Sequence, residues 1–129
     1  MERADDVNRK GYRNLKIYQE AHVLVKAVYS ATERFPKSEI FGLTSQMRRC
    51  AVSVVANICE GYARTSKREF LQFLSVARGS LAELEYYLEL SLELDYLSSS
   101  EYEKFEAQRT TAGALLGGFT RRLRNDSSQ

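Results

Sequence analysis

Hydrogen-bonding and charged side chains recur at helical spacing between residues 43 and 61. Steps of three and four place them on one face of a helix, and they are Gln46, Arg49, Ser53, Asn57 and Glu60. Such a face can be solvated, or it can form a polar network in which each group has a partner. Ser80 and Glu83 share one face of a later predicted helix and have the reach to join these residues. We interpret all seven as a structural network for helix or subunit packing rather than as a catalytic site.

The sequence shows no combination of residues that indicates catalysis. The single histidine, His22, lies on a predicted apolar helix face, so we interpret it as a packed or interface residue rather than as a base. A di-iron site in a helix bundle needs Glu-x-x-His pairs on two helices, which one histidine cannot supply. The chain has neither a Gly-rich phosphate loop nor a nucleophile motif. We expect a protein that is not an enzyme and that has no metal or cofactor.

The two cysteines, Cys50 and Cys59, fall in the same predicted helix. Their separation places them on opposite faces, because each residue turns the helix by about 100°, so they cannot pair with each other. Neither cysteine has the spacing of zinc ligands. We expect buried, reduced thiols.

Composition indicates one helical domain. The 129 residues include one proline, seven glycines and 43% apolar residues, with a net charge of only +2. The N-terminal residues are charged and polar, and no apolar run approaches the roughly 20 residues that a membrane span needs. We therefore expect a cytoplasmic protein with no membrane partner.

Four helices are predicted from apolar periodicity and end signals. Pro36 ends the first helix and Gly61 the second, while Ser66 and Ser98 begin the third and fourth as capping residues. The predicted segments are a flexible arm (1–13), helices at about 14–34, 43–62, 67–95 and 100–124, and a frayed tail (125–129). Short connections favour an all-α, antiparallel up-down-up-down four-helix bundle over residues 14–124.

Apolar residues cover more helix surface than one core requires. In the first helix the predicted apolar stripe consists of Leu15, Tyr18, His22, Val25 and Tyr29. It is widened by a flanking set, Ile17, Ala21, Leu24, Val28 and Ala31. In the third helix the surplus residues are Leu71, Val76, Tyr87, Leu90, Leu94 and Leu97. The surplus indicates either a wide core or a subunit interface, and we favour the interface. For Gly113, Gly117 and Gly118 in the fourth helix, close helix contact and a bend both remain open.

The bundle topology predicts two oppositely charged poles. At one pole ten basic residues against three acidic ones give a formal charge of +7. These basic residues are Arg9, Lys10, Arg13, Lys16, Arg64, Lys67, Arg68, Arg121, Arg122 and Arg124. At the other pole, six acids against Lys104 give residues 89–106 a formal charge of −5. The basic pole would attract phosphate backbones, with Tyr12 and Tyr62 placed to stack on unpaired bases, or it is simply a solvated end.

Three motifs occur in order along the chain: FP-x-x-E-x-x-GLT-x-Q-x-RR, S-x-x-x-NI-x-EG and ARGS-x-x-E. In this the chain resembles the four-helix-bundle proteins encoded in intervening sequences of bacterial 23S ribosomal RNA genes. The accessory variability proteins of diversity-generating retroelements share that fold. The matching positions are Gln46, Arg48, Arg49, Ser53, Asn57, Glu60, Gly61, Gly79, Ser80 and Glu83. The chain departs from the family pattern at Tyr18, Val54, Val55 and Cys59, which weakens the expectation of a helix kink near Val55.

The resemblance implies a homopentameric ring of bundles, and for the retroelement members it implies binding to nucleic acid and to a reverse transcriptase. For most members no activity is defined. Two functions follow. The favoured one is a non-enzymatic oligomer that binds nucleic acid, RNA above DNA, through its basic pole. The alternative is a scaffold that binds a protein such as a polymerase and makes no direct contact with nucleic acid.

Overall fold

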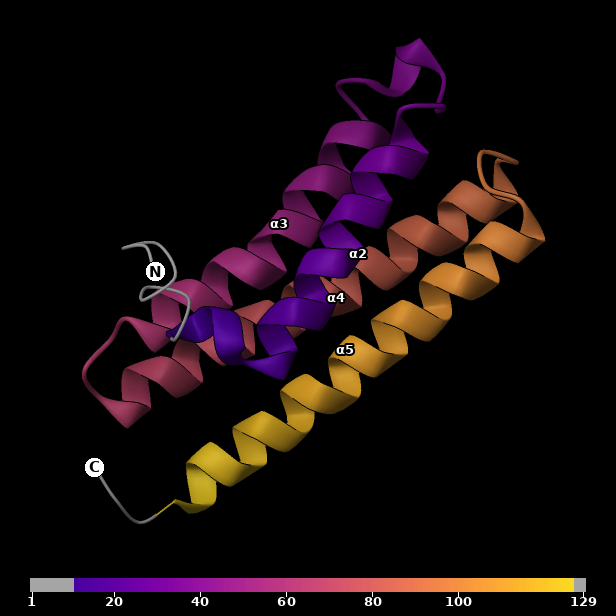
Figure 1. The fold of residues 1–129 in the computed structure, drawn as a ribbon. Coiled ribbons are helices and arrows are strands. Elements are labelled where there is room, and N and C mark those ends of the chain that lie inside the picture. Colours follow the sequence, from indigo (N-terminus) through magenta and orange to yellow (C-terminus); the bar gives the residue numbers. More distant parts are fainter. Residues whose placement is uncertain (1–10, 127–129) are drawn as a thin grey trace, which may run out of the picture.

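The computed structural model describes residues 11–126, which fold into four long α-helices joined by short turns (Figure 1). The helices are α2 (Lys16–Thr32), α3 (Leu43–Tyr62), α4 (Lys67–Glu93) and α5 (Ser99–Asn125). Two short 3-10 helices, η1 (Tyr12–Asn14) and η2 (Lys37–Glu39), precede α2 and α3. Residues 11–126 contain no strand, so this part of the chain is all-α.

Helix ends differ from the predicted bounds where local turns intervene. The first helix is shorter than predicted at both ends, and η1 occupies three residues just before it. The third helix ends two residues early because Asp95 takes a left-handed conformation with φ 64°, which stops the helix. Residue 125, predicted to be frayed, is helical. Of the predicted N-terminal arm, residues 11–13 belong to an ordered turn and residues 1–10 lie outside the described part, as do residues 127–129 of the tail.

Capping explains where α4 and α5 begin. The Ser66 hydroxyl accepts a hydrogen bond from the Glu69 amide at 3.0 Å. At the start of α5, Ser98 and Glu101 form a reciprocal capping box. Ser98 Oγ accepts a hydrogen bond from the Glu101 amide, and the Glu101 carboxylate accepts one from the Ser98 amide at 2.8 Å. These bonds satisfy amides that have no partner within the helix, which holds both turns in place.

Contacts between helix ends define two poles of the molecule. Rings of Tyr12, before α2, and Tyr62, at the end of α3, have centroids 6.4 Å apart. Lys67, at the start of α4, donates a hydrogen bond to the Asp126 carbonyl just after α5. The start of the described chain, the α3–α4 turn and the end of α5 therefore share one end, which we call the basic pole (Figure 1). The η2 turn and the α4–α5 turn lie at the other end, which we call the acidic pole.

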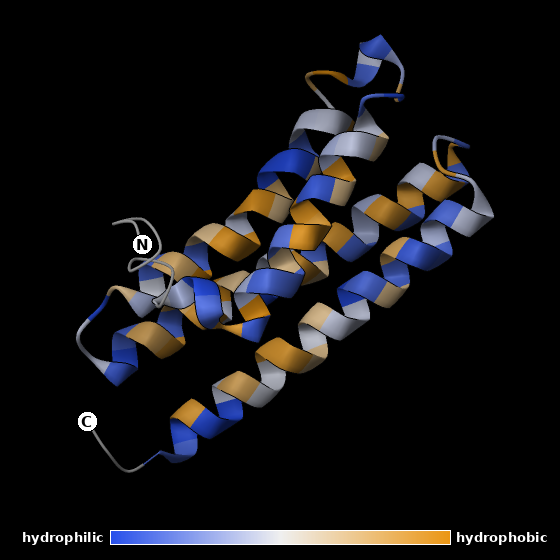
Figure 2. Cartoon of the chain, in the orientation of Figure 1, coloured by the Kyte–Doolittle hydropathy of each residue, from blue (hydrophilic) through white to orange (hydrophobic). Residues whose placement is uncertain are grey.

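Each helix packs against two others, with α2 and α4 both contacting α3 and α5. Apolar residues of all four helices form the core (Figure 2), and the largest fully buried ones include Leu24, Met47, Ile58, Leu74, Leu84 and Leu88. The predicted stripe of α2 is wrong in part. The fully buried face is the flanking set from Ile17 to Ala31, and His22 and Tyr29 are exposed, while Leu15, Tyr18 and Val25 are partly buried against the core. Among the surplus residues of the third predicted helix, Leu97 is buried and Val76 is exposed. None of the helices within residues 11–126 is long and apolar enough to cross a membrane.

Candidate nucleic-acid interface and polar seam

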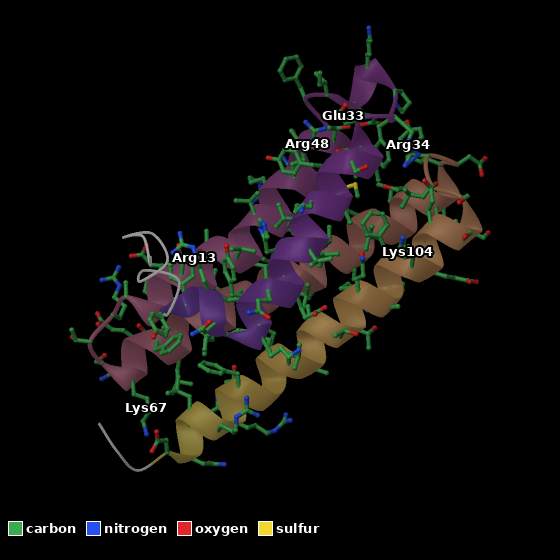
Figure 3. All side chains as sticks on the ribbon, viewed as in Figure 1. Arg13, Glu33, Arg34, Arg48, Lys67 and Lys104 are labelled. Atoms are coloured by element: carbon green, nitrogen blue, oxygen red, sulfur yellow. The ribbon has the colours of Figure 1, made fainter. Side chains whose placement is uncertain are left out.

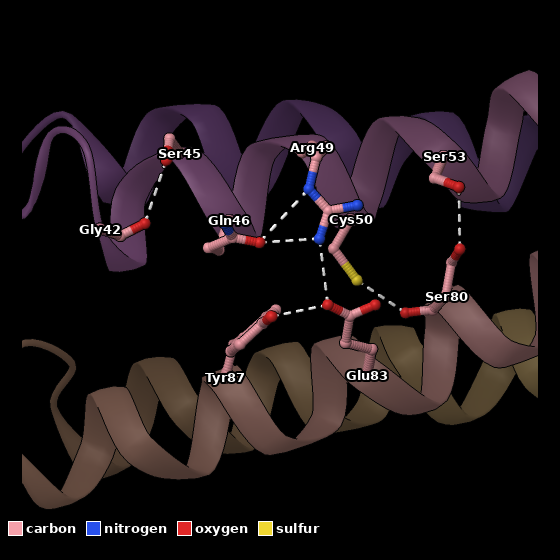
Figure 4. Close-up of polar contacts among 9 residues, drawn as sticks. All are labelled: Gly42, Ser45, Gln46, Arg49, Cys50, Ser53, Ser80, Glu83 and Tyr87. Carbon is pink, nitrogen blue, oxygen red and sulfur yellow. Dashed lines mark hydrogen bonds and ion pairs between the residues drawn. The ribbon is translucent and has the colours of Figure 1, made fainter.

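The polar residues of α3 meet α4 along one edge of the α3–α4 contact, which we call the polar seam (Figure 4). Arg49 Nη2 donates to the Glu83 carboxylate at 3.1 Å and to the Gln46 side-chain oxygen at 2.7 Å. The Arg49 and Glu83 side chains are 59% and 41% exposed, so their ion pair contributes at most about 1 kcal/mol. This end of the seam therefore orients helices more than it stabilises them.

The inner part of the seam is better shielded from solvent. The hydroxyls of Ser53 and Ser80 share a hydrogen bond at 2.8 Å, which joins α3 to α4. Asn57 donates to the Ser53 carbonyl at 2.7 Å and to its hydroxyl at 3.0 Å. Glu60 does not join the seam: it pairs at 2.6 Å with Arg64, which lies in the turn just after α3. Six of the seven predicted network residues thus come together, and within the subunit they bridge two helices.

Two seam residues do not stand out in the sequence. Tyr87 donates its hydroxyl proton to Glu83 at 2.6 Å, and this hydrogen bond raises the pKa of the phenol. Cys50 donates to the Ser80 carbonyl at 2.8 Å. Tyr87 belongs to the surplus apolar residues of α4, although its position four residues after Glu83 places both on one face.

Because the thiol of Cys50 is buried, we expect the protein to lose stability at alkaline pH. Burial raises the pKa of this thiol to about 12, whereas in the unfolded chain the thiol titrates near its ordinary pKa of 9.0. Between these values the folded state keeps a proton that the unfolded state releases, so stability is full below pH 9 and falls as pH rises through this window. Between pH 8 and pH 10 we expect the free energy of unfolding to fall by about 1 kcal/mol. Urea denaturation at both values tests this, and Cys50→Ala should show a smaller fall; an equal fall in both proteins would contradict it.

The described cations of the predicted binding set gather at the basic pole, and Figure 3 labels two of them, Arg13 and Lys67. Two of the predicted residues, Arg9 and Lys10, lie outside the described part of the chain. Arg64 is held by Glu60 and lies over the Phe73 ring at 4.9 Å. Lys67 is held by the Asp126 carbonyl. Both side chains are engaged in contacts within the subunit, so they are less available to a ligand than the sequence alone indicates.

Five other cations are exposed and make no ion pair within residues 11–126: Lys16, Arg68, Arg121, Arg122 and Arg124. Two of them have guanidinium groups beside glycines of α5. A Cβ atom at Gly117 would lie 3.5 Å from Arg121 Nη1, and one at Gly118 would lie 3.4 Å from Arg122 Nη1. The guanidinium groups therefore lie back along α5 instead of extending from its end.

Three shallow hollows open among these cations. One is lined on α5 by Arg121 and Arg122, and a second on α4 by Lys67 and Arg68 with apolar Leu71. The third lies between the α3–α4 turn and the end of α5, with Lys67 on its wall. Cationic walls around shallow, partly apolar hollows suit a phosphate backbone that follows the surface with its sugars or bases packed against it.

Aromatic rings continue across the same pole as a connected series. Tyr18 contacts Tyr12 and Tyr62 contacts Phe70, with ring centroids 5.1 and 6.2 Å apart. Arg13 lies over the Tyr12 ring at 4.6 Å. The series ties η1 to the helices, and Tyr62 remains 41% exposed beside the cations. Both tyrosines predicted to meet unpaired bases therefore lie at the basic pole.

His22 stacks on Tyr18, with centroids 5.7 Å apart and nearly parallel rings, and is otherwise exposed. It has no carboxylate partner among the ion pairs of residues 11–126. Within the same residues, no group of three or more His, Cys, Asp and Glu side chains is placed to hold a metal ion. Cys50 and Cys59 are both free thiols, and Cys59 is only partly buried.

Comparison with known proteins identifies a similar fold and the family to which the chain belongs. No curated protein matches the chain significantly. The crystal structure of a protein of unknown function from the S23 ribosomal protein family of Bacteroides thetaiotaomicron superposes with a TM-score of 0.73 at 23% identity. The superposition covers 81% of this chain and 98% of the Bacteroides protein. The sequence profile of the 23S rRNA-intervening sequence proteins matches residues 13–118, which is most of the chain. The chain therefore belongs to the family of 23S rRNA-intervening sequence proteins.

Proposed function

We propose that this protein is a non-enzymatic, oligomeric helix-bundle protein that binds nucleic acid, RNA in preference to DNA, through its basic pole. The observation that carries the proposal is the group of exposed cations without ion-pair partners within residues 11–126, gathered from α2, α4 and α5 at one end of the molecule. Other exposed cations either pair with an acid, as Arg34 does with Glu101 at 2.8 Å, or are spread singly over the surface, as Lys37, Arg78 and Lys104 are. Phosphates are the ligands that a surface with such an excess of positive charge attracts.

The arrangement of the helices in this proposal is antiparallel, up-down-up-down, and the assembly is a homopentameric ring. The end-to-end contacts at both poles support the antiparallel order, because each helix end lies beside the start of a neighbour. In a ring of parallel subunits, five basic poles would form one cationic rim. Such a rim contacts the backbone of an RNA without reading its sequence, so affinity depends on length and salt more than on base identity.

Fluorescence anisotropy with a labelled 20-nucleotide single-stranded RNA tests the proposal. The logarithm of the binding constant should fall linearly with the logarithm of salt concentration, with a slope of about −0.7 for each phosphate neutralised. A DNA strand of the same length serves as the comparison. No binding to either strand at low salt, or binding that salt does not weaken, would refute the proposal.

One observation favours the second candidate, a protein-binding scaffold. Phe41 is 95% exposed and Ile40 is 52% exposed, side by side in the turn before α3 at the acidic pole. This turn is held in shape, because Glu39 accepts hydrogen bonds from the Leu43 amide at 3.0 Å and from the Tyr96 hydroxyl at 2.9 Å. A fixed and fully exposed aromatic side chain is typical of a contact residue. The scaffold is favoured if a stoichiometric protein copurifies after nuclease treatment and Phe41→Ser abolishes its recovery.

A further inference from the structure

Two exposed apolar surfaces lie on the sides of the molecule, away from both poles. The first, which we call the α2/α3 face, is a shallow hollow between these helices lined by His22, Val25, Val52, Val55 and Ala56. The second, which we call the α4 face, runs along one side of α4 and consists of Val76, Gly79, Ala82 and Tyr86. Val52 is 40% exposed, Val76 52% and Tyr86 59%. Neither face is covered by any part of residues 11–126.

The two faces lie at the same level along the molecule. The hydrogen bond of 2.8 Å between Ser53 and Ser80 fixes which residues of α3 and α4 are level. Val52 adjoins Ser53, and Gly79 adjoins Ser80. A rotation about an axis parallel to the helices preserves this level, so it can bring the α2/α3 face of one copy against the α4 face of another.

Gly79 is a second, independent sign of a contact on the α4 face. A glycine inside a helix costs about 1 kcal/mol relative to alanine. At Gly61 the subunit itself explains the glycine, because a Cβ would lie 2.8 Å from the Phe70 ring. At Gly79 a Cβ would meet no atom of residues 11–126 within 4 Å. This described part of the chain therefore gives no reason for a glycine here, whereas close approach of a neighbouring chain does.

Charge also matches across the two faces. Beside the α2/α3 face, on the side of the acidic pole, lie Lys26 and Arg48, the latter over the Tyr29 ring at 4.6 Å. In the same direction from the α4 face, one and two turns beyond Tyr86, lie the exposed Glu89 and Glu93. Juxtaposing the faces would place these cations near these acids, which favours this pairing over either face meeting itself.

We propose that the α2/α3 face of one copy packs onto the α4 face of a second copy, with Gly79 at the point of closest approach. The inference rests on the oligomer in the proposed function and assigns the surfaces that build it. The contact is heterologous, since it joins two different faces, and repetition by rotation closes a ring. It leaves the basic pole free.

Size-exclusion chromatography with light scattering tests the contact on the full chain. Val52→Glu alters only the α2/α3 face and Gly79→Glu only the α4 face, and each should reduce the assembled protein to single chains of 14.8 kDa. Mixed together, the two variants should form a pair of twice that mass, because one intact α2/α3 face and one intact α4 face remain. Val23→Glu is the control: Val23 is 46% exposed on α2 outside both faces, so this variant should stay assembled.

Circular dichroism shows whether each variant is folded. If Val52→Glu does not fold, Ala56→Glu takes its place on the α2/α3 face, and if Gly79→Glu does not fold, Tyr86→Glu takes its place on the α4 face. If the native protein is assembled and one variant stays assembled, or the mixture yields no pair, the assigned faces are wrong while the oligomer stands. If the native chain has a mass of 14.8 kDa at micromolar concentration, both the assigned faces and the oligomer of the proposed function are overturned.

Discussion

Replacing Arg68, Arg121 and Arg122 together by glutamine is expected to weaken binding to single-stranded RNA by roughly tenfold to a hundredfold at low salt. All three are exposed at the basic pole, and none has an ion-pair partner within residues 11–126. An exposed ion pair between an arginine and a phosphate contributes about 0.5–1 kcal/mol, and the removal of three such ion pairs gives the stated range. The dependence on salt should also become shallower, by about two units of slope.

The matched control removes the same charge elsewhere. Lys37, Arg78 and Lys104 are also exposed and lie outside the basic pole. Replacing these three by glutamine should leave the affinity within about twofold, since local contacts and not the net charge hold the RNA. Equal losses of affinity in both triple variants would mean that the RNA responds only to the net charge of the protein.

Gly61→Ala is expected to destabilise the fold by about 1–2 kcal/mol, the largest effect we expect from adding a single methyl group. The new Cβ would lie 2.8 Å from Phe70 Cδ1 and 2.9 Å from Phe73 Cβ, and the latter atom moves only with the α4 backbone. Overpacking of this kind costs about 1–3 kcal/mol, and the better helix propensity of alanine returns at most about 1 kcal/mol.

Urea denaturation of Gly61→Ala and of Gly113→Ala measures this effect. Gly113 is the control, because its Cβ would meet only Leu81 Cδ2 at 3.5 Å, an ordinary contact. Gly113→Ala should be neutral or slightly more stable than the native protein. If Gly61→Ala were more stable than the native protein, α3 and α4 would have to lie farther apart at Gly61 than they do in the structure.

Local signals predict the helices well where the residues themselves carry the information. Ser66 and Ser98 occupy the N-cap positions of α4 and α5, because capping needs only residues near in sequence. The end of α4 is harder to predict because Asp95 takes a conformation that usually calls for glycine. The core face of α2 differs from the predicted stripe because apolar residues cover most of that helix, and only tertiary packing decides which of them turn inward.

The polar seam shows where sequence reasoning reaches its limit. That Arg49 and Ser53 share a face follows from helical periodicity, but that they meet Glu83 and Ser80 depends on the register of α3 against α4. Gly61 has the character of a residue that ends a helix, yet it lies within α3 and allows the approach of Phe70. The intramolecular partners of Lys67 and Arg64 likewise depend on how the helix ends meet.

Mapping crosslinks from a 4-thiouridine RNA by mass spectrometry shows where on the protein the RNA lies. We expect crosslinks in peptides of the basic pole, above all those containing Tyr12, Tyr62 and residues 119–126. Tyr86 is 59% exposed on the α4 face, away from both poles, and should remain unmodified. Crosslinks confined to Tyr86 or to the turns of the acidic pole would contradict the assignment of the basic pole as the nucleic-acid interface.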